Sequence, residues 1–274
     1  MTDLMRAGAD LDLSAIDPRS TPGFDGGKSE GQVALAEGVD ELSSLQERLY
    51  AASRVGHTPR VLLVLQAMDT AGKGGIVRHV VGAVDPQGVQ LASFKKPTAE
   101  ELAEHFLARI ERRLPAPGMI GVFDRSHYED VLIARVRSLV EPEVIERRYG
   151  EIRDFERRVA DGGTRIVKVM LHISPEEQKE RLAERLDRAD KHWKYNPGDV
   201  DERLLWPDYM AAYERAIAET DADHAPWYVV PADRKWFARM TVQRLLTEAL
   251  RELDPQWPTA DFDVEAEKAR LAAS

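Results

Sequence analysis

The sequence VLLVLQAMDTAGKGGIVRHVV, residues 61–81, joins an aliphatic run to a small-residue loop and then to an amphipathic segment. This order predicts a strand, a glycine loop carrying Lys73, and a helix, which is the layout of a phosphate-binding P-loop. The usual pattern, G-x-x-x-x-G-K-[ST], is broken at both ends. Ala67 replaces its first glycine, and Gly74 replaces the Ser or Thr whose hydroxyl binds Mg²⁺. An acidic residue, Asp69, also lies inside the loop. Any function assigned to the loop must account for these three departures from the usual pattern.

The composition is that of an acidic globular chain. Its 274 residues can build one sizeable core or at most two small domains. The formal charge of −10 argues against general nucleic-acid binding, although a local basic channel can still bind an anionic substrate. No apolar run reaches the roughly 18 residues of a membrane span, so we expect no membrane partner. The absence of cysteine excludes disulfides and thiolate catalysis and fits a cytoplasmic location.

The chain divides into an extension and a single domain. Residues 1–31 are rich in Asp, Ser, Pro and Gly and predict a flexible N-terminal extension, either a free arm or a segment lying along the surface. Residues 32–274 form one domain, which opens with a helix over Val33–Arg54.

Strand-like and helix-like segments alternate along this domain and predict an α/β fold, a parallel sheet with helices on both faces. The predicted strands are Val61–Ala67, Gln90–Phe94, Met119–Asp124, Arg165–Ile173 and Trp227–Ala232. The predicted helices are Lys73–Val84, Ala99–Arg113, Tyr128–Val140, Glu143–Asp161, Pro175–Arg188, Pro207–Glu219 and Arg234–Leu253.

One segment interrupts the alternation. Asp187–Leu205 is charged and aromatic and contains Asn196-Pro197-Gly198, where a compact domain needs only a short link. Beside a P-loop, such an insertion predicts a lid over residues 187–206, and an ordinary solvated loop is the alternative.

Charged residues follow the first three strands. Because ligands bind at the carboxyl ends of parallel strands, these residues should converge on one edge of the sheet. They are Asp69 and Lys73 after the first strand, Lys95 and Lys96 after the second, and Asp124 and Arg125 after the third.

Two residues of the loop have chemistry suited to phosphate. Lys73 can reach the oxygens of a transferring phosphoryl group, whereas a plain solvent lysine is disfavoured at the start of a helix unless an anion binds there. Asp69 next to a phosphate needs a cation between them, so it can hold Mg²⁺ or orient an acceptor phosphate. Its alternative is a structural role in capping the following turn.

A carboxylate and a guanidinium, Asp124 and Arg125, stand at the end of the third predicted strand. Asp124 follows MIGVF as a Walker B acid does and can bind Mg²⁺ directly or through water. Arg125 offers a fork of donors to phosphate oxygens, with a structural ion pair as its alternative.

Further residues predict an electropositive channel for substrate. Arg185 and Arg188 are three apart on a helix, so they should share a face beside the lid. The substrate-binding set comprises Gly72, Gly74, Arg78, Glu129, Arg135, Arg185 and Arg188.

Long motifs in the chain resemble those of the family 2 polyphosphate kinases. They include LQAMDTAGKGG, GVFDRSHYEDVLIARV and RLDRADKHWKYNPGDVDERLLWPDYMAAYERAI, and the resemblance extends over about residues 35–254. It implies a three-layer α/β/α P-loop kinase fold with a five-stranded parallel sheet and a helical lid. It also implies Mg²⁺-dependent, reversible phosphoryl transfer between inorganic polyphosphate and nucleotides.

The resemblance assigns roles to particular residues. Asp69 and Asp124 would serve the metal ions and the acceptor phosphate, while Lys73, Arg125 and Arg185 would hold the transferring phosphate and the chain. The stretch DRSHYED, which contains Glu129, is closer to the AMP-using or dual-use members. The expected partners are polyphosphate, adenine nucleotides with guanine nucleotides as a second option, and further copies of the chain.

Two other functions stay open on the residues alone. One is an ATP-dependent nucleotide or small-metabolite kinase with the same core. The other is a P-loop module that binds phosphate chains without turnover, although two added carboxylates would gain such a module nothing.

Overall fold

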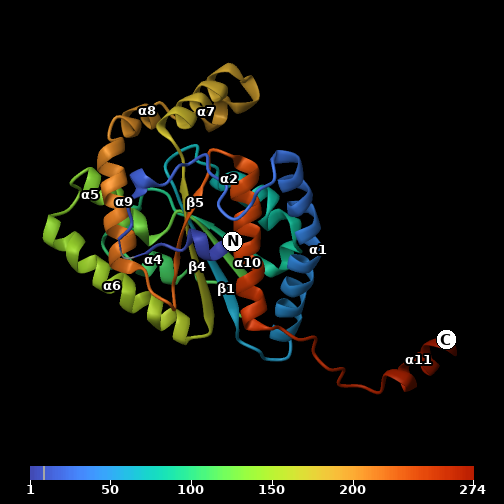
Figure 1. Cartoon of the computed structure of the whole chain (residues 1–274). Coiled ribbons are helices and arrows are strands. Elements are labelled where there is room, and N and C mark those ends of the chain that lie inside the picture. The colour runs from blue at the N-terminus through green and yellow to red at the C-terminus, as the bar shows by residue number, and fades with distance from the viewer. Residues whose placement is uncertain (9) are drawn as a thin grey trace.

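The computed structural model describes residues 1–8 and 10–274, and its centre is a five-stranded parallel sheet (Figure 1). The order in space is β2-β3-β1-β4-β5, with every neighbouring pair parallel. The predicted parallel α/β fold is confirmed, and each strand lies within one residue of its expected bounds. The strands are β1 (Arg60–Gln66), β2 (Val89–Ser93), β3 (Ile120–Asp124), β4 (Thr164–His172) and β5 (Trp227–Pro231).

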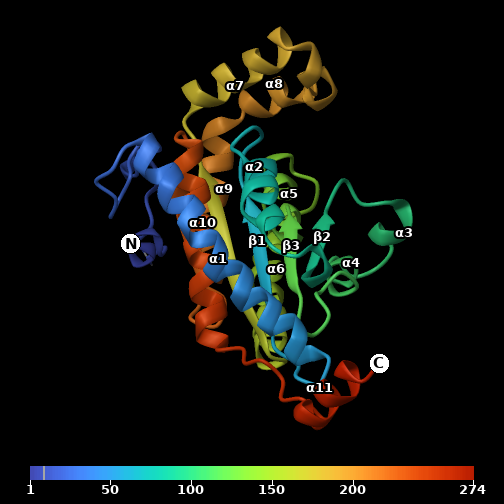
Figure 2. The same ribbon diagram turned by 90° about the vertical axis from the view of Figure 1, so that its right-hand side faces the viewer.

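Two helical layers cover the sheet, which gives three layers in all (Figure 1). On one face α10 packs on the central strands, with α2 beside it and α1 lying along its outer side (Figure 2). The opposite face carries α5, α6 and α9. Because helices cover both faces, the central strands are aliphatic on both sides, and residues 61–66 of β1 are all buried. The covering helices are α1 (Lys28–Ser53), α2 (Lys73–His79), α5 (Ile133–Val136), α6 (Pro142–Asp161), α9 (Trp206–Thr220) and α10 (Lys235–Leu253).

Residues before α1 lie along the body of the protein over much of their length. Met5 and Leu13 are buried, and the Ala7 N–H donates to the Trp227 carbonyl at 2.9 Å beside β5. Of the two forms expected for residues 1–31, these described residues take the surface-lying one, because they contribute apolar side chains to the core.

Three predicted helices are shorter than expected. The helix from Lys73 ends at His79, and residues 99–113 form two single turns, α3 (Ala99–Leu102) and α4 (Ala108–Glu111). Residues 128–140 contain a 3₁₀ turn, η5 (His127–Asp130), and only one α-helical turn, α5. Helices are stabilised mainly by packing, and α3 buries none of its residues, so nothing extends it.

A helical projection rises beyond the carboxyl ends of the strands (Figures 1 and 2). It contains the segment predicted as a lid and is built from α7 (Pro175–Asp187), a 3₁₀ turn η6 (Ala189–Lys194) and α8 (Gly198–Arg203). At the opposite end, α11 (Val264–Ala272) lies away from the body. Across the described residues, no helix is both long and apolar enough to cross a membrane.

Candidate functional site

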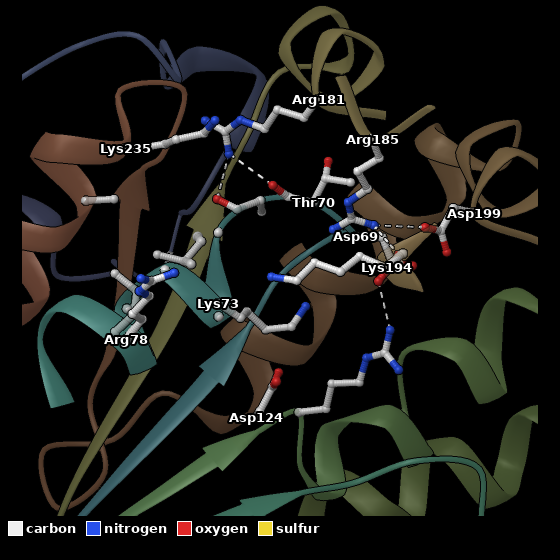
Figure 3. Close-up of a pocket in the computed structure, with 18 of the residues that line it drawn as sticks. Asp69, Thr70, Lys73, Arg78, Asp124, Arg181, Arg185, Lys194, Asp199 and Lys235 are labelled. Atoms are coloured by element: carbon white, nitrogen blue, oxygen red, sulfur yellow. Dashed lines mark hydrogen bonds and ion pairs between the residues drawn. The ribbon is translucent and has the colours of Figure 1, made fainter. Parts of the chain in front are cut away.

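A cavity of about 630 Å³ opens at the carboxyl ends of the strands, under the helical projection (Figure 3). Its walls are the loop between β1 and α2, the end of β3, the first turns of α10, and residues of α7 and η6. Ten Lys and Arg residues line it against four Asp and Glu residues, although the whole chain carries a net charge of −10. The local excess of positive charge suits a polyanion.

Lys73 lies at the centre of this cavity. It begins α2, and its Nζ donates to the Ala67 carbonyl at 3.0 Å, which folds the side chain back over the loop. Burial lowers the pKa of Lys73 from its ordinary value of 10.5, while the nearby Asp69 carboxylate opposes this shift. An anion in the cavity would favour the charged form and so raise this pKa, as expected of a phosphate-binding lysine.

Arg125 and Asp69 form an ion pair across the cavity, with 2.8 Å between Nη2 and Oδ1 (Figure 3). Arg125 has a left-handed backbone with φ of 64°, unusual for a non-glycine residue, immediately after β3. Burial lowers the pKa of Arg125, but the carboxylates of Glu129 and Asp69 outweigh it and the net shift is upward. The guanidinium is therefore permanently charged where β3 ends.

Asp124 has a carboxylate suited to a metal ion. Within the described residues it makes no side-chain hydrogen bond or ion pair, and it faces the cavity near Lys73 (Figure 3). No group of three or more His, Cys, Asp or Glu residues gathers around a common point in the part of the chain that the structure describes. Mg²⁺ usually takes only one or two protein carboxylates, with waters and substrate phosphates completing its shell. Asp124 and Asp69 together fit that requirement.

Cations missed by the sequence interpretation extend the cavity along α2 and α10. Lys235 and Arg239, one turn apart on α10, join Arg78 and His79 of α2. Burial lowers the pKa of Arg239, and the neighbouring charges of Arg181 and Arg78 lower it further. Two cations in the first turns of a helix are unfavourable without an anion, and this was the available sequence signal.

A second cavity, of about 220 Å³, adjoins the first, and Asp69 and Arg125 line both. Its other walls include the apolar and aromatic side chains of Leu132, Ile133, Tyr209 and Tyr213, and the carboxylates of Glu129, Asp199 and Glu202. Burial raises the pKa of Glu129 above its ordinary value of 4.5, against the opposing effect of Arg125. Arg125 is the one Lys or Arg residue among its described lining residues, and two tyrosines offer aromatic surface, so this cavity suits an organic group better than a bare polyanion.

Most of the predicted site residues converge, but two do not. Arg135 pairs with Glu146 at 3.1 Å, and Arg188 pairs with Glu184 and Asp190, so both guanidinium groups lie outside the two cavities. Glu129 lies in the second cavity. The first cavity contains Asp69, Gly72, Lys73, Gly74, Arg78, Asp124, Arg125 and Arg185.

Arg185→Ala should reduce turnover far more than Arg188→Ala. Arg185 faces the cavity and is held by the Lys194 carbonyl at 3.0 Å and by Asp199 at 3.4 Å. Loss of a charge-assisted hydrogen bond to phosphate should lower kcat/KM by about 10- to 100-fold. Arg188 makes only exposed ion pairs, so its removal should stay within about twofold. Steady-state kinetics of both variants tests this, and equal losses would contradict the placement of Arg185.

These features are those of a P-loop phosphotransferase. The sheet is parallel, Lys73 lies in the loop after β1, and Asp124 ends the neighbouring strand β3. The family model described as Polyphosphate kinase 2 (PPK2) matches residues 26–258, and the chain belongs to this family.

Individual relatives are similar over nearly their whole length. The AMP/ADP-polyphosphate phosphotransferase of Meiothermus ruber is 47% identical over 90% of this chain and 91% of its own. The ADP-polyphosphate phosphotransferase of Rhodopseudomonas palustris is 42% identical, covering 92% of this chain and 89% of its own. The crystal structure of Polyphosphate Kinase 2 from Arthrobacter aurescens TC1 has a TM-score of 0.97 and 56% identity, covering 99% of this chain and 96% of its own.

Proposed function

We propose that this protein transfers the terminal phosphoryl group of inorganic polyphosphate to AMP, ADP or both, and catalyses the reverse reaction. The observation that carries this proposal is the junction of two unlike cavities at Asp69 and Arg125. The first is lined mainly by cations, and the second by tyrosine, aliphatic and carboxylate side chains. The names of the relatives, which include AMP/ADP-polyphosphate phosphotransferase, support the same substrates.

The two cavities divide the substrates between them. The polyphosphate chain would lie along the cations of the first cavity, from Lys73 toward Arg78 and Arg239, since it needs charge and little else. The nucleoside would enter the second cavity, where Tyr209 and Tyr213 offer aromatic surface. The reacting phosphates would then meet beside Arg125. We propose adenine nucleotides as the acceptors, with guanine nucleotides as a second option.

The transfer needs positioning and charge rather than a covalent intermediate. An oxygen of the acceptor phosphate attacks the terminal phosphorus of polyphosphate. A new P–O bond forms, and the bond to the bridging oxygen breaks, so that this oxygen stays on the shortened chain. Lys73 and Arg125 would neutralise the oxygens around the transferred group. Asp69 and Asp124 would hold Mg²⁺, which supplies further neutralisation when bound. The proposed lid, residues 187–206, would limit access of water.

Product analysis without ATP tests the function. Incubation with polyphosphate, Mg²⁺ and either AMP or ADP should yield ADP or ATP, resolved by ion-exchange chromatography. An ATP-dependent kinase would give product only after ATP is added. Stoichiometric polyphosphate binding without product from either nucleotide would instead identify a binding module.

The expected self-association has a candidate surface in the C-terminal arm, residues 255–274. Trp257, Phe262 and Leu271 are 52%, 59% and 77% exposed, and α11 buries no residue. A helix of this length is marginal in water unless it packs on something. We therefore propose a homo-oligomer that covers this arm, and light scattering of the native chain and of Trp257→Ser/Phe262→Ser should show the variant in a smaller state.

A further inference from the structure

Side chains of α7 hold three main-chain carbonyls of the phosphate loop. Gln178 Nε2 donates to the Asp69 carbonyl at 3.1 Å. Arg181 Nη1 donates to the carbonyls of Thr70 and Ala71 at 3.0 and 2.9 Å (Figure 3). Gln178 and Arg181 are 1% and 5% exposed, so both are built into the molecule rather than lying on its surface. The sequence interpretation assigned neither residue a role.

These carbonyls are the acceptors that α2 would use if it began one turn earlier. In an α-helix each N–H bonds to the carbonyl four residues before it, which pairs Lys73, Gly74 and Gly75 with residues 69–71. In the structure Gly75 instead bonds back to the Gly72 carbonyl at 2.7 Å. Over the described residues, the N–H groups of Lys73 and Gly74 have no protein acceptor. Both residues line the first cavity, so these N–H groups remain available to a ligand there.

The loop does not keep this shape by local preference. Thr70 has φ of 66°, a left-handed conformation that is strained for a β-branched residue. The other arm of Arg181, Nη2, bonds to the carbonyls of Ala232 and Asp233 at 2.7 and 2.9 Å, just beyond β5. Its Nε pairs with Glu177 at 2.8 Å. Arg181 is thus fixed on two sides and holds the loop from a rigid base.

We propose that Gln178 and Arg181 are positioning residues that keep the phosphate loop from winding into α2. By occupying the carbonyls of residues 69–71, they leave the N–H groups of Lys73 and Gly74 free for oxygens of the donor phosphate. The effect does not depend on direct contact between these side chains and the substrate. The inference rests on the proposed phosphate-binding role of the loop, but not on which donor or acceptor is used.

Hydrogen exchange at individual amides gives a signature that ordinary destabilisation cannot produce. Gln178→Met keeps the side-chain length and the charge but removes the donor to Asp69, together with the Oε1 acceptor of Arg203, which keeps its bond to the Pro175 carbonyl. The freed Asp69 carbonyl would then accept from the Lys73 N–H, so exchange at Lys73 should slow by about tenfold. Gly74 should stay unchanged, because Arg181 still holds the Thr70 carbonyl. Leu182→Ala, on the same helix and also buried, is the control that loosens α7 without freeing a loop carbonyl. Unchanged or faster exchange at Lys73 in Gln178→Met would overturn the proposal for Gln178.

Arg181→Lys separates the fork geometry from its charge. Lysine keeps the positive charge but cannot span the loop and the end of β5 together. We expect slowed exchange at Gly74, whose helical acceptor is the freed Thr70 carbonyl, and no slowing at Lys73, whose acceptor Gln178 still holds. We also expect an approximately tenfold higher KM for polyphosphate with the acceptor KM within about twofold. Native exchange and native donor KM in this variant would show that charge alone suffices and would overturn the role of Arg181. If native protein fails to use polyphosphate, the proposed function fails, while the exchange experiment still decides this inference.

Discussion

Lys73→Ala is expected to lower kcat/KM for phosphoryl transfer by about 10³-fold or more, the order seen when a preorganised charge at a reacting oxygen is lost. Lys73 is the residue that the loop and the Ala67 carbonyl aim into the cavity. Its removal leaves Asp69 and Asp124 facing the phosphates with one cation fewer. The fold should be little affected, because among the described residues the ammonium group makes one protein contact, its hydrogen bond to the Ala67 carbonyl.

Steady-state kinetics with polyphosphate and nucleotide, together with urea unfolding, measures both parts of this prediction. Lys179→Ala is the matched control, since Lys179 is exposed on α7 and lies outside both cavities. The control should retain turnover within about twofold. Near-native turnover by Lys73→Ala would show that the transferred group lies elsewhere.

The sequence predicted the sheet well because a parallel sheet covered on both faces leaves a simple pattern. Strand β1, for example, is a continuous aliphatic run whose polar residues stand only at its two ends. Lys73, Asp124 and Arg125 could be found for the same reason, since Asp124 ends β3, Arg125 follows it, and Lys73 comes after the loop that follows β1. The position of a residue relative to the predicted strands was therefore enough to find most residues of the candidate site.

What the sequence missed depends on contacts between distant segments. Gln178 and Arg181 bind main-chain carbonyls more than 100 residues earlier, and a carbonyl acceptor has no residue type to recognise. The prediction that Arg188 lines the channel beside Arg185 was wrong for a different reason. The helix α7 ends at Asp187, and Arg188 has an extended backbone with φ of −110° and ψ of 112°, so it no longer shares a face with Arg185.

The turn that carries Arg125 is backed by a buried ionic network. Lys168 of β4 donates to Glu156 of α6 at 2.6 Å and to Tyr128 Oη at 2.9 Å. His127 approaches the same carboxylate at 3.2 Å. Lys168, Glu156 and His127 are at most 2% exposed. Because His127 and Tyr128 follow Arg125 closely in the chain, the network fixes the segment whose strained backbone aims the guanidinium.

Lys168→Met should lower the free energy of unfolding at pH 7 by roughly 3–5 kcal/mol, the usual cost of leaving one member of a buried pair uncompensated. Methionine fills similar space, so the loss reports charge rather than a cavity. Urea unfolding followed by circular dichroism measures it. Arg158→Met, which breaks an exposed pair with Glu111, is the control and should change the free energy by less than about 1 kcal/mol.

The lower free energy of unfolding of Lys168→Met should depend on pH, because it comes from the unpaired carboxylate of Glu156. In the native protein burial raises the pKa of Glu156, but Lys168 and His127 outweigh it and hold the pKa below the ordinary 4.5. That pairing contributes stability above pH 4.5, which is lost as the pH falls through the lowered value. In Lys168→Met, burial acts with less opposition and the pKa of Glu156 rises, so protonation relieves the unpaired charge as the pH falls toward 4.5. The difference between native and variant should therefore shrink from pH 7 to pH 5. An equal difference at both values would place the loss in packing and leave the Arg125 turn without this electrostatic support.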